Sequence, residues 1–180
     1  MKKVSISLAM ARSMALNAQL LDGQTNLAPG KEGIAQTVEA LGYVQIDTIA
    51  VIRRAHHHTL WTRQPDYQPK LLHELQAKDR RVFEYWGHAA SYLPMSDYRY
   101  YLPRMRGFND PKSKWEKQRL EKHGHLMEPV LERIRQEGPL TSKDFTPPPG
   151  TKRGTWWDWK PAKVALEMLF WRGDLMITER

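Results

Sequence analysis

The segment RVFEYWGHAASYL, residues 81–93, decides the fold class of this 180-residue chain. Apolar and aromatic residues stand on both sides of Gly87, a pattern that predicts two short strands joined by a tight glycine turn. Helical patterns precede this hairpin along the chain. Helices followed by a small hairpin are the order of elements in a winged-helix domain, so we expect an α+β fold that is mainly helical.

Four helical patterns come before the hairpin. Ser7 can cap a helix whose apolar stripe runs on to Leu21, with Gly23 as the stop. A second helix is expected over residues 31–41, and Gly42 can end it. Residues 50–63 favour a third helix, and leucines at 71, 72 and 75 indicate a short fourth one.

The segment YVQIDTI, residues 43–49, alternates apolar and polar residues and therefore predicts a short strand. Period two places Val44 and Ile46 on one side, and Gln45 and Asp47 together on the other. An amide and a carboxylate on one side can hold a water molecule, which the amide orients and the carboxylate deprotonates. Alone, a Gln-x-Asp triplet is more often a surface pair or a helix cap.

The order of elements begins again after the hairpin. The sequence SKWE at 113–116 is a capping box that opens a long helix, which must bend or restart at Pro129 and end near 138–139. A second helix-start signal stands at 141–144. Pro161 can lie in the first turn of a helix that ends near residue 172, and residues 175–179 read as a strand.

We therefore expect two tandem winged-helix units. Residues 1–110 form the first unit and carry the Gln-x-Asp motif, and residues 111–180 form the second. The second unit would be incomplete at its C-terminal wing, because a strand at 175–179 has no partner in the sequence. This favours a longer protein, of which the chain is the N-terminal part.

The charge of the chain favours a polyanionic partner. Its formal net charge is +8, and residues 99–135 hold ten Lys and Arg against five Asp and Glu. Such a basic stretch attracts nucleic acid, although a basic protein without such a partner fits the charge equally well. Cysteine is absent, which excludes disulfides, thiolate metal sites and thiol nucleophiles. A phosphate-binding glycine loop and a G-x-S-x-G motif are also absent.

Several cations and aromatic residues are candidates for contacts with DNA, because cations can bind phosphates and aromatic rings can stack on bases. A solvated helix face for the arginines and core packing for most of the tryptophans are the alternatives. The candidates are Arg53, Arg54, Arg63, Trp86, His88, Trp156, Trp157, Lys160 and Lys163.

Three consecutive histidines, residues 56–58, do not predict a metal site. Adjacent residues do not share a helix or strand face, and no carboxylate stands at the required helical spacing. The N-terminus does not predict a secretory signal, because Arg12 and several polar residues interrupt the apolar stretch. No apolar run is long enough for a membrane helix. We expect a cytoplasmic protein.

Three blocks taken together resemble the bacterial YcaQ/AlkZ family of winged-helix DNA glycosylases. They are LGYVQIDTI at 41–49, FEYWGHA at 83–89, and GTWWDWKP at 154–161 followed by LEMLF at 166–170. The resemblance covers nearly the whole chain. The Gln-x-Asp form is similar to the YcaQ (AlkX) branch rather than to the AlkZ branch, which has Gln-x-Gln.

The resemblance implies hydrolysis of the N-glycosidic bond of alkylated bases by a monofunctional DNA glycosylase, and the unhooking of interstrand crosslinks. It assigns catalysis to Gln45 and Asp47 only, with no metal and no cofactor. The implied partner is double-stranded DNA with alkylated or crosslinked bases, bound by a monomer in the bacterial nucleoid. A non-catalytic winged-helix regulator with the same fold is the alternative, and a histidine-metal hydrolase is a more distant one.

Overall fold

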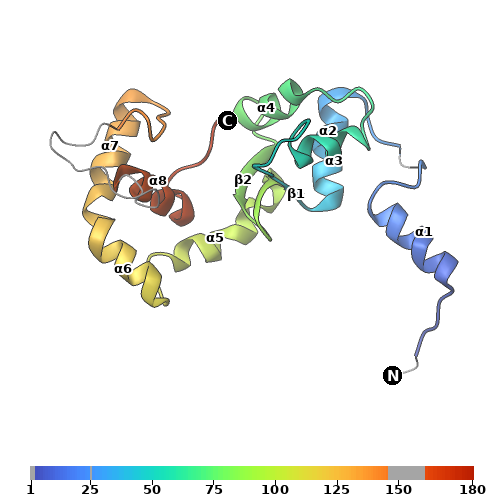
Figure 1. Ribbon diagram of the computed structural model, residues 1–180, viewed down its shortest axis with the longest axis horizontal. Coiled ribbons are helices and arrows are strands. Elements are labelled where there is room, and N and C mark those ends of the chain that lie inside the picture. Colours follow the sequence, from blue (N-terminus) through green and yellow to red (C-terminus); the bar gives the residue numbers. More distant parts are fainter. Residues whose placement is uncertain (1–2, 25, 146–160) are drawn as a thin grey trace. The chain divides into compact units, whose positions relative to one another are not determined.

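The computed structural model describes residues 3–24, 26–145 and 161–180 (Figure 1). The chain forms two compact units, Met1–Tyr98 together with Glu179–Arg180, and Arg99–Thr178. The expected limits of two winged-helix domains, 1–110 and 111–180, stay a prediction. The fold is α+β and mainly helical, as the sequence predicts.

The helices of the first unit follow local signals in the sequence. The Ser7 hydroxyl accepts a hydrogen bond from the Met10 N–H and starts the first helix. Gly42, in the left-handed conformation with φ 76°, ends the second. The four helices are α1 (Leu8–Ala18), α2 (Gly30–Leu41), α3 (Ala55–Trp61) and α4 (Pro69–Ala77).

Three short antiparallel strands complete the first unit. The strands are β1 (Val44–Gln45), β2 (Val82–Trp86) and β3 (Ala90–Pro94), in the order β1-β3-β2. The predicted hairpin is therefore β2 and β3, and the strand of the Gln-x-Asp motif lies along the outer side of β3. Gln45 is opposite Ser91 in this register, and Ser91 is opposite Tyr85.

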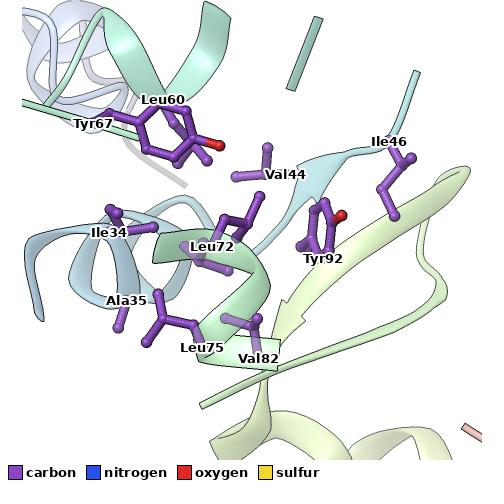
Figure 2. Packing of buried hydrophobic residues seen from close by; sticks show 11 residues of the cluster. Ile34, Ala35, Val44, Ile46, Leu60, Tyr67, Leu72, Leu75, Val82 and Tyr92 are labelled. Carbon is purple, nitrogen blue, oxygen red and sulfur yellow. The ribbon is translucent and has the colours of Figure 1, made fainter. Parts of the chain in front are cut away.

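One buried cluster packs the helices against one face of this sheet, as Figure 2 shows. Apolar side chains of α2, α3 and α4 meet Val44 and Ile46 from the β1 segment and Tyr92 from β3. The other buried members are Ile34, Ala35, Val38, Leu60, Tyr67, Leu72, Leu75 and Val82. This packing holds β1 through its apolar side and leaves its other side available.

Three elements of the first unit are shorter than the sequence predicts. The α1 helix ends at Ala18 rather than near residue 21, and Leu20 has a positive φ of 55°. The strand predicted over 43–49 is only two residues long, because the chain turns at Asp47. The helix predicted over 50–63 begins only at Ala55, because Ala50 and Arg54 pair with each other and close a loop.

The second unit is helical. Its helices are α5 (Tyr98–Gly107), α6 (Lys114–His123), α7 (Met127–Glu137) and α8 (Pro161–Arg172). The 3-10 turns Met95–Asp97 and Gly124–Leu126 precede α5 and α7. The capping box at Ser113 and Glu116 is formed with both of its hydrogen bonds. Apolar side chains of α7 and α8 make the core, which includes Met127, Val130, Val164, Ala165, Met168 and Leu169.

Two predictions for the second unit are wrong in the described part of the chain. The signal at 141–144 forms a hydrogen-bonded turn instead of a helix in the described residues. The Asp144 carboxylate accepts hydrogen bonds from both the N–H and the hydroxyl of Thr141, and the Asp144 N–H donates to the Thr141 carbonyl. Residues 175–179 form no strand and belong to no sheet of the described residues.

Candidate active site

The Gln-x-Asp segment has the alternation that the sequence predicts. Val44 and Ile46 are buried in the cluster beneath the sheet, whereas Gln45 is exposed and Asp47 is half-buried. Neither polar side chain belongs to the buried apolar cluster. The Gln45 amide and the Asp47 carboxylate are thus available on the side of the segment that faces away from the core.

The hairpin holds this segment in place. The Ile46 N–H donates to the carbonyl of Ala90 at 2.8 Å, which continues the pairing of β1 with β3 for one more residue. The buried Ser91 hydroxyl donates to the Ala89 carbonyl at 3.0 Å and stiffens the hairpin turn from within. The Gly87 N–H donates to the same carbonyl at 2.9 Å. The motif therefore lies beside the turn of the hairpin, on a scaffold of backbone hydrogen bonds.

Asp47 has one oxygen engaged and one available. Its Oδ1 accepts a hydrogen bond from the Ile49 N–H at 2.8 Å, a local turn that fixes the rotamer of the carboxylate. Within the described residues, Oδ2 of Asp47 accepts no hydrogen bond, and the Gln45 carboxamide makes none either. An oriented carboxylate with a free oxygen can take a proton from water or stabilise a nearby positive charge.

The predicted arginines differ in their surroundings. Arg53 is exposed, and Arg54 is half-buried at the start of α3. Arg63 is tied into the protein, because its Nε donates to the Gln19 carbonyl and its Nη1 to the Thr59 carbonyl, both at 2.9 Å. Burial lowers the pKa of Arg63. Arg63 therefore links α3 to the end of α1, and its contact with DNA stays a prediction.

The aromatic and lysine candidates are spread over both units. Trp86 and His88 lie at the hairpin turn and are both exposed, close in sequence to the Ala90 carbonyl that holds Ile46. Lys163 is half-buried on α8 in the second unit. Trp156, Trp157 and Lys160 lie outside the described residues, so their predicted contacts with DNA stay predictions.

The three consecutive histidines differ in their surroundings. His56 is buried and packs edge-on against the Tyr92 ring, and burial lowers its pKa to about 4. The His57 Nδ1 lies 2.7 Å from the Tyr67 hydroxyl, and burial lowers the pKa of His57 as well. His58 is exposed beside Trp61. In the described ranges, no three side chains of ligand type gather into a possible metal site.

Sequence reasoning missed an apolar surface directly after the motif. Ile49, Val51 and Ile52 are exposed, although an apolar run normally predicts burial in a helix or strand. The only signal is the loss of alternation after Asp47, which by itself does not distinguish an exposed loop from a buried element.

A small hollow in the second unit is not a site for a base. It is lined by aromatic, apolar and charged side chains that include Phe108, Arg119, Met168 and Trp171, and its cavity volume is about 20 Å³. Such a volume holds about one water molecule and is far too small for a nucleobase.

The helices in the described part of the chain are too short or too polar to cross a membrane.

Comparison with known proteins identifies the family. No solved structure matches the chain. A model of the AlkZ-like DNA glycosylase family matches residues 38–180, a range that begins in α2 and includes the Gln-x-Asp segment, the hairpin and the second unit. Because this match extends over most of the sequence, the chain belongs to the AlkZ-like family of DNA glycosylases.

Proposed function

We propose that this protein is a monofunctional DNA repair glycosylase that hydrolyses the N-glycosidic bond of cationic N7-alkylated purines, with Asp47 and Gln45 as its catalytic residues. The observation that carries the proposal is the accessible pair on one side of the β1 segment, in which the carboxamide of Gln45 and one oxygen of Asp47 are free of hydrogen bonds within the described residues. Membership of a DNA glycosylase family supports the reaction class.

The chemistry of an N7-alkylated purine suits this sparse site. The base already carries a positive charge, so it leaves as a neutral base when the electron pair of the bond from C1′ to N9 returns to the ring. The enzyme then has to stabilise the oxocarbenium-like sugar and deliver water to C1′. The free oxygen of Asp47 can do both, because an ionised carboxylate attracts the cationic sugar and accepts the proton of the attacking water.

Gln45 completes the site by orienting the water. Its carboxamide offers two N–H donors and a carbonyl acceptor, and it is one residue from the Ile46 N–H that fixes the backbone to the hairpin. The product is a free base and an abasic site. We propose no cleavage of the DNA backbone, because a glycosylase that cleaves it uses an amine nucleophile, and neither Gln45 nor Asp47 carries one.

A winged-helix arrangement of the first unit supports binding to a duplex. The order α2, β1, α3, α4, β2, β3, with β1 against β3, is the element order of such a domain. Its wing would be the hairpin turn with Trp86 and His88, beside the motif. Arg53 and Arg54 would neutralise phosphates near the site.

The open position of the motif extends the proposal to crosslinks. The two side chains lie on a surface segment rather than in a closed cavity. A base that is covalently joined to the opposite strand cannot rotate freely into a deep pocket, but it can reach a surface site. We therefore include the unhooking of interstrand crosslinks in the proposed activity.

The decisive experiment replaces Asp47 by asparagine. The amide of this variant, D47N, still offers an oxygen to the Ile49 N–H, so the substitution removes the charge and retains the local turn. We expect base release from an N7-methylguanine duplex, scored as abasic sites, to fall by at least about 100-fold, with duplex binding retained. Asp110→Asn is the matched control, because Asp110 is an exposed carboxylate in the second unit.

Normal base release by D47N would overturn the assignment of Asp47. Duplex binding without base release by the unaltered protein would instead favour a regulator that lacks catalysis. A footprinting experiment on undamaged DNA distinguishes that regulator, because it predicts protection of one particular sequence.

A further inference from the structure

We propose that the loop after the motif, residues 49–53, is an apolar wedge that enters the DNA duplex next to the base held at Asp47. The loop carries three large apolar side chains with high exposure, Ile49 at 72%, Val51 at 92% and Ile52 at 83%. Single exposed apolar residues are ordinary, but three within four positions form a surface that needs a partner.

The loop is held at both ends. At its start, the Ile49 N–H donates to Oδ1 of Asp47 at 2.8 Å. At its end, Ala50 and Arg54 pair as an antiparallel bridge, and Arg54 immediately precedes α3. Val51, Ile52 and Arg53 thus form a three-residue tip on a closed base. A tip that is ordered before binding loses little conformational entropy when it inserts.

The charge around the loop indicates which partner it meets. Arg53 is exposed at the tip, and Arg54 follows it. No acidic residue occurs between Asp47 and Asp66 in the sequence. The tip is apolar, has flanking cations and is followed by a stretch without carboxylates. These features fit binding to a duplex, because apolar side chains of a protein can separate base pairs while its arginines bind the phosphates.

The position of the loop assigns it a task. Asp47 holds the loop through its Oδ1 and is proposed to act on the sugar through its other oxygen, so whatever the tip touches lies next to the reacting nucleotide. Insertion of Val51 and Ile52 would partly unstack the neighbouring base pair and expose C1′ of the lesion to the carboxylate. This inference rests on the proposed function, and it adds the element that opens the duplex.

The test measures unstacking directly, with the full chain. The probe is a duplex in which 2-aminopurine lies beside an N7-methylguanine nucleotide with fluorine at the 2′ position of its sugar. The fluorine slows cleavage, and the fluorescence of 2-aminopurine increases when this base unstacks. The double variant V51S/I52S removes both apolar side chains of the tip. The matched control V4S/I6S makes the same two changes in exposed residues of the N-terminal segment.

We expect the unaltered protein and V4S/I6S to raise the fluorescence, and V51S/I52S to lose this rise. Duplex affinity of V51S/I52S should fall by on the order of tenfold or more, the loss expected for one or two buried aliphatic side chains. The dependence of its affinity on salt should be unchanged, because the number of phosphate contacts is the same. Both serines replace exposed side chains, so the melting temperature of V51S/I52S should equal that of the unaltered protein. If the melting temperature falls, the same measurements are made on V51T, because threonine keeps the shape of valine.

Several outcomes would overturn the wedge. They are a normal fluorescence rise with V51S/I52S, an equal loss with V4S/I6S, or a dimer of the unaltered protein that V51S/I52S dissociates. Base release from a cleavable N7-methylguanine duplex is measured separately. Release without unstacking rejects the wedge and keeps the glycosylase, whereas unstacking without release keeps the wedge and rejects the proposed activity.

Discussion

Gly33 shows how tightly one position of α2 is packed. A Cβ atom at this residue would overlap the Ala28 carbonyl oxygen and the side-chain amide of Gln64. The carbonyl belongs to the backbone and cannot move aside as a flexible side chain does. We expect Gly33→Ala to lower the free energy of unfolding by about 1–3 kcal/mol, the usual cost of overpacking, which exceeds the gain of about 1 kcal/mol in helix propensity.

Urea denaturation followed by circular dichroism measures this change. Gly107→Ala is the control, because a Cβ at Gly107 meets nothing within 4 Å. Equal effects of the two substitutions would show that the packing around Gly33 does not determine the cost.

His56 makes the stability of the first unit depend on pH. Burial lowers its pKa from 6.5 to about 4, and the positive charges of Arg54 and Arg180 and the neighbouring ring of His57 act in the same direction. The unfolded chain therefore binds a proton more readily than the folded one. The contribution of neutral His56 to the free energy of unfolding is fully present above pH 6.5. It is lost as the pH falls to about 4, by up to on the order of 3 kcal/mol.

His56→Gln should reduce this loss, whereas His58→Gln, at an exposed position, should leave it unchanged. The measurement is the free energy of unfolding in urea at several pH values between neutrality and pH 4. An unchanged pH dependence in His56→Gln would assign the effect to other groups, of which His57 is the nearest candidate.

At the scale of elements, two serine caps offer a comparison. The hydroxyls of Ser7 and Ser113 each accept a backbone hydrogen bond at 3.1 Å, from Met10 and Glu116. The α6 helix packs on the core of the second unit through the partly buried Leu120, whereas no residue of α1 belongs to either buried cluster. Ser113→Ala should therefore destabilise the second unit by about 1 kcal/mol, and Ser7→Ala should fray α1 without changing global stability.

Hydrogen exchange measures both changes, because it reports local and global opening separately. Faster exchange across α6, α7 and α8 is expected for Ser113→Ala. A global effect of Ser7→Ala would mean that α1 is more firmly attached than its exposure indicates.

Local signals explain which elements the sequence could predict. The capping box at Ser113, the glycine stop at Gly42 and the glycine turn at Gly87 each depend on neighbouring residues, and the structure contains all three. The end of β1 depends on the turn at Asp47, and the start of α3 depends on the bridge between Ala50 and Arg54, a pairing that no local pattern predicts. The signal at Thr141 gives a turn rather than a helix, although the Asp144 carboxylate accepts from the Thr141 N–H as the carboxylate of a capping box does.

The candidate site was predictable to the same extent. Period two places Gln45 and Asp47 on one side of their segment, and this follows from strand geometry alone. The hydrogen bond from Ile46 to the Ala90 carbonyl depends on the register of the hairpin, which no local pattern determines. The exposure of Val51 and Ile52 contradicts the ordinary rule for apolar residues, so only the structure could show it.

At the scale of the whole molecule, the net charge of +8 predicts binding to DNA that depends strongly on salt. Each phosphate contact releases counterions, so affinity for a duplex should fall on the order of 10- to 1,000-fold between about 50 and about 200 mM salt. Fluorescence anisotropy of a labelled duplex measures this dependence. Affinity that does not respond to salt would contradict an electrostatic interface.

Arg53→Gln should lower the slope of log affinity against log salt by about one, the effect of losing one phosphate contact. Arg80→Gln is the control, because Arg80 is exposed near the end of β2 that is opposite the hairpin turn. Equal slopes for the two variants would remove Arg53 from the interface.

The ion pair between Glu84 and Arg180 has a consequence for synthesis of the chain. Glu84 lies in the middle of β2 with only 4% exposure, and Nε of Arg180 donates to its Oε2 at 2.7 Å. A buried carboxylate is unfavourable until its counterion arrives. The buried Glu84 carboxylate therefore lacks this counterion until the ribosome has translated Arg180, 96 positions later in the sequence. The first unit to emerge thus reaches its final stability only after the second has been made.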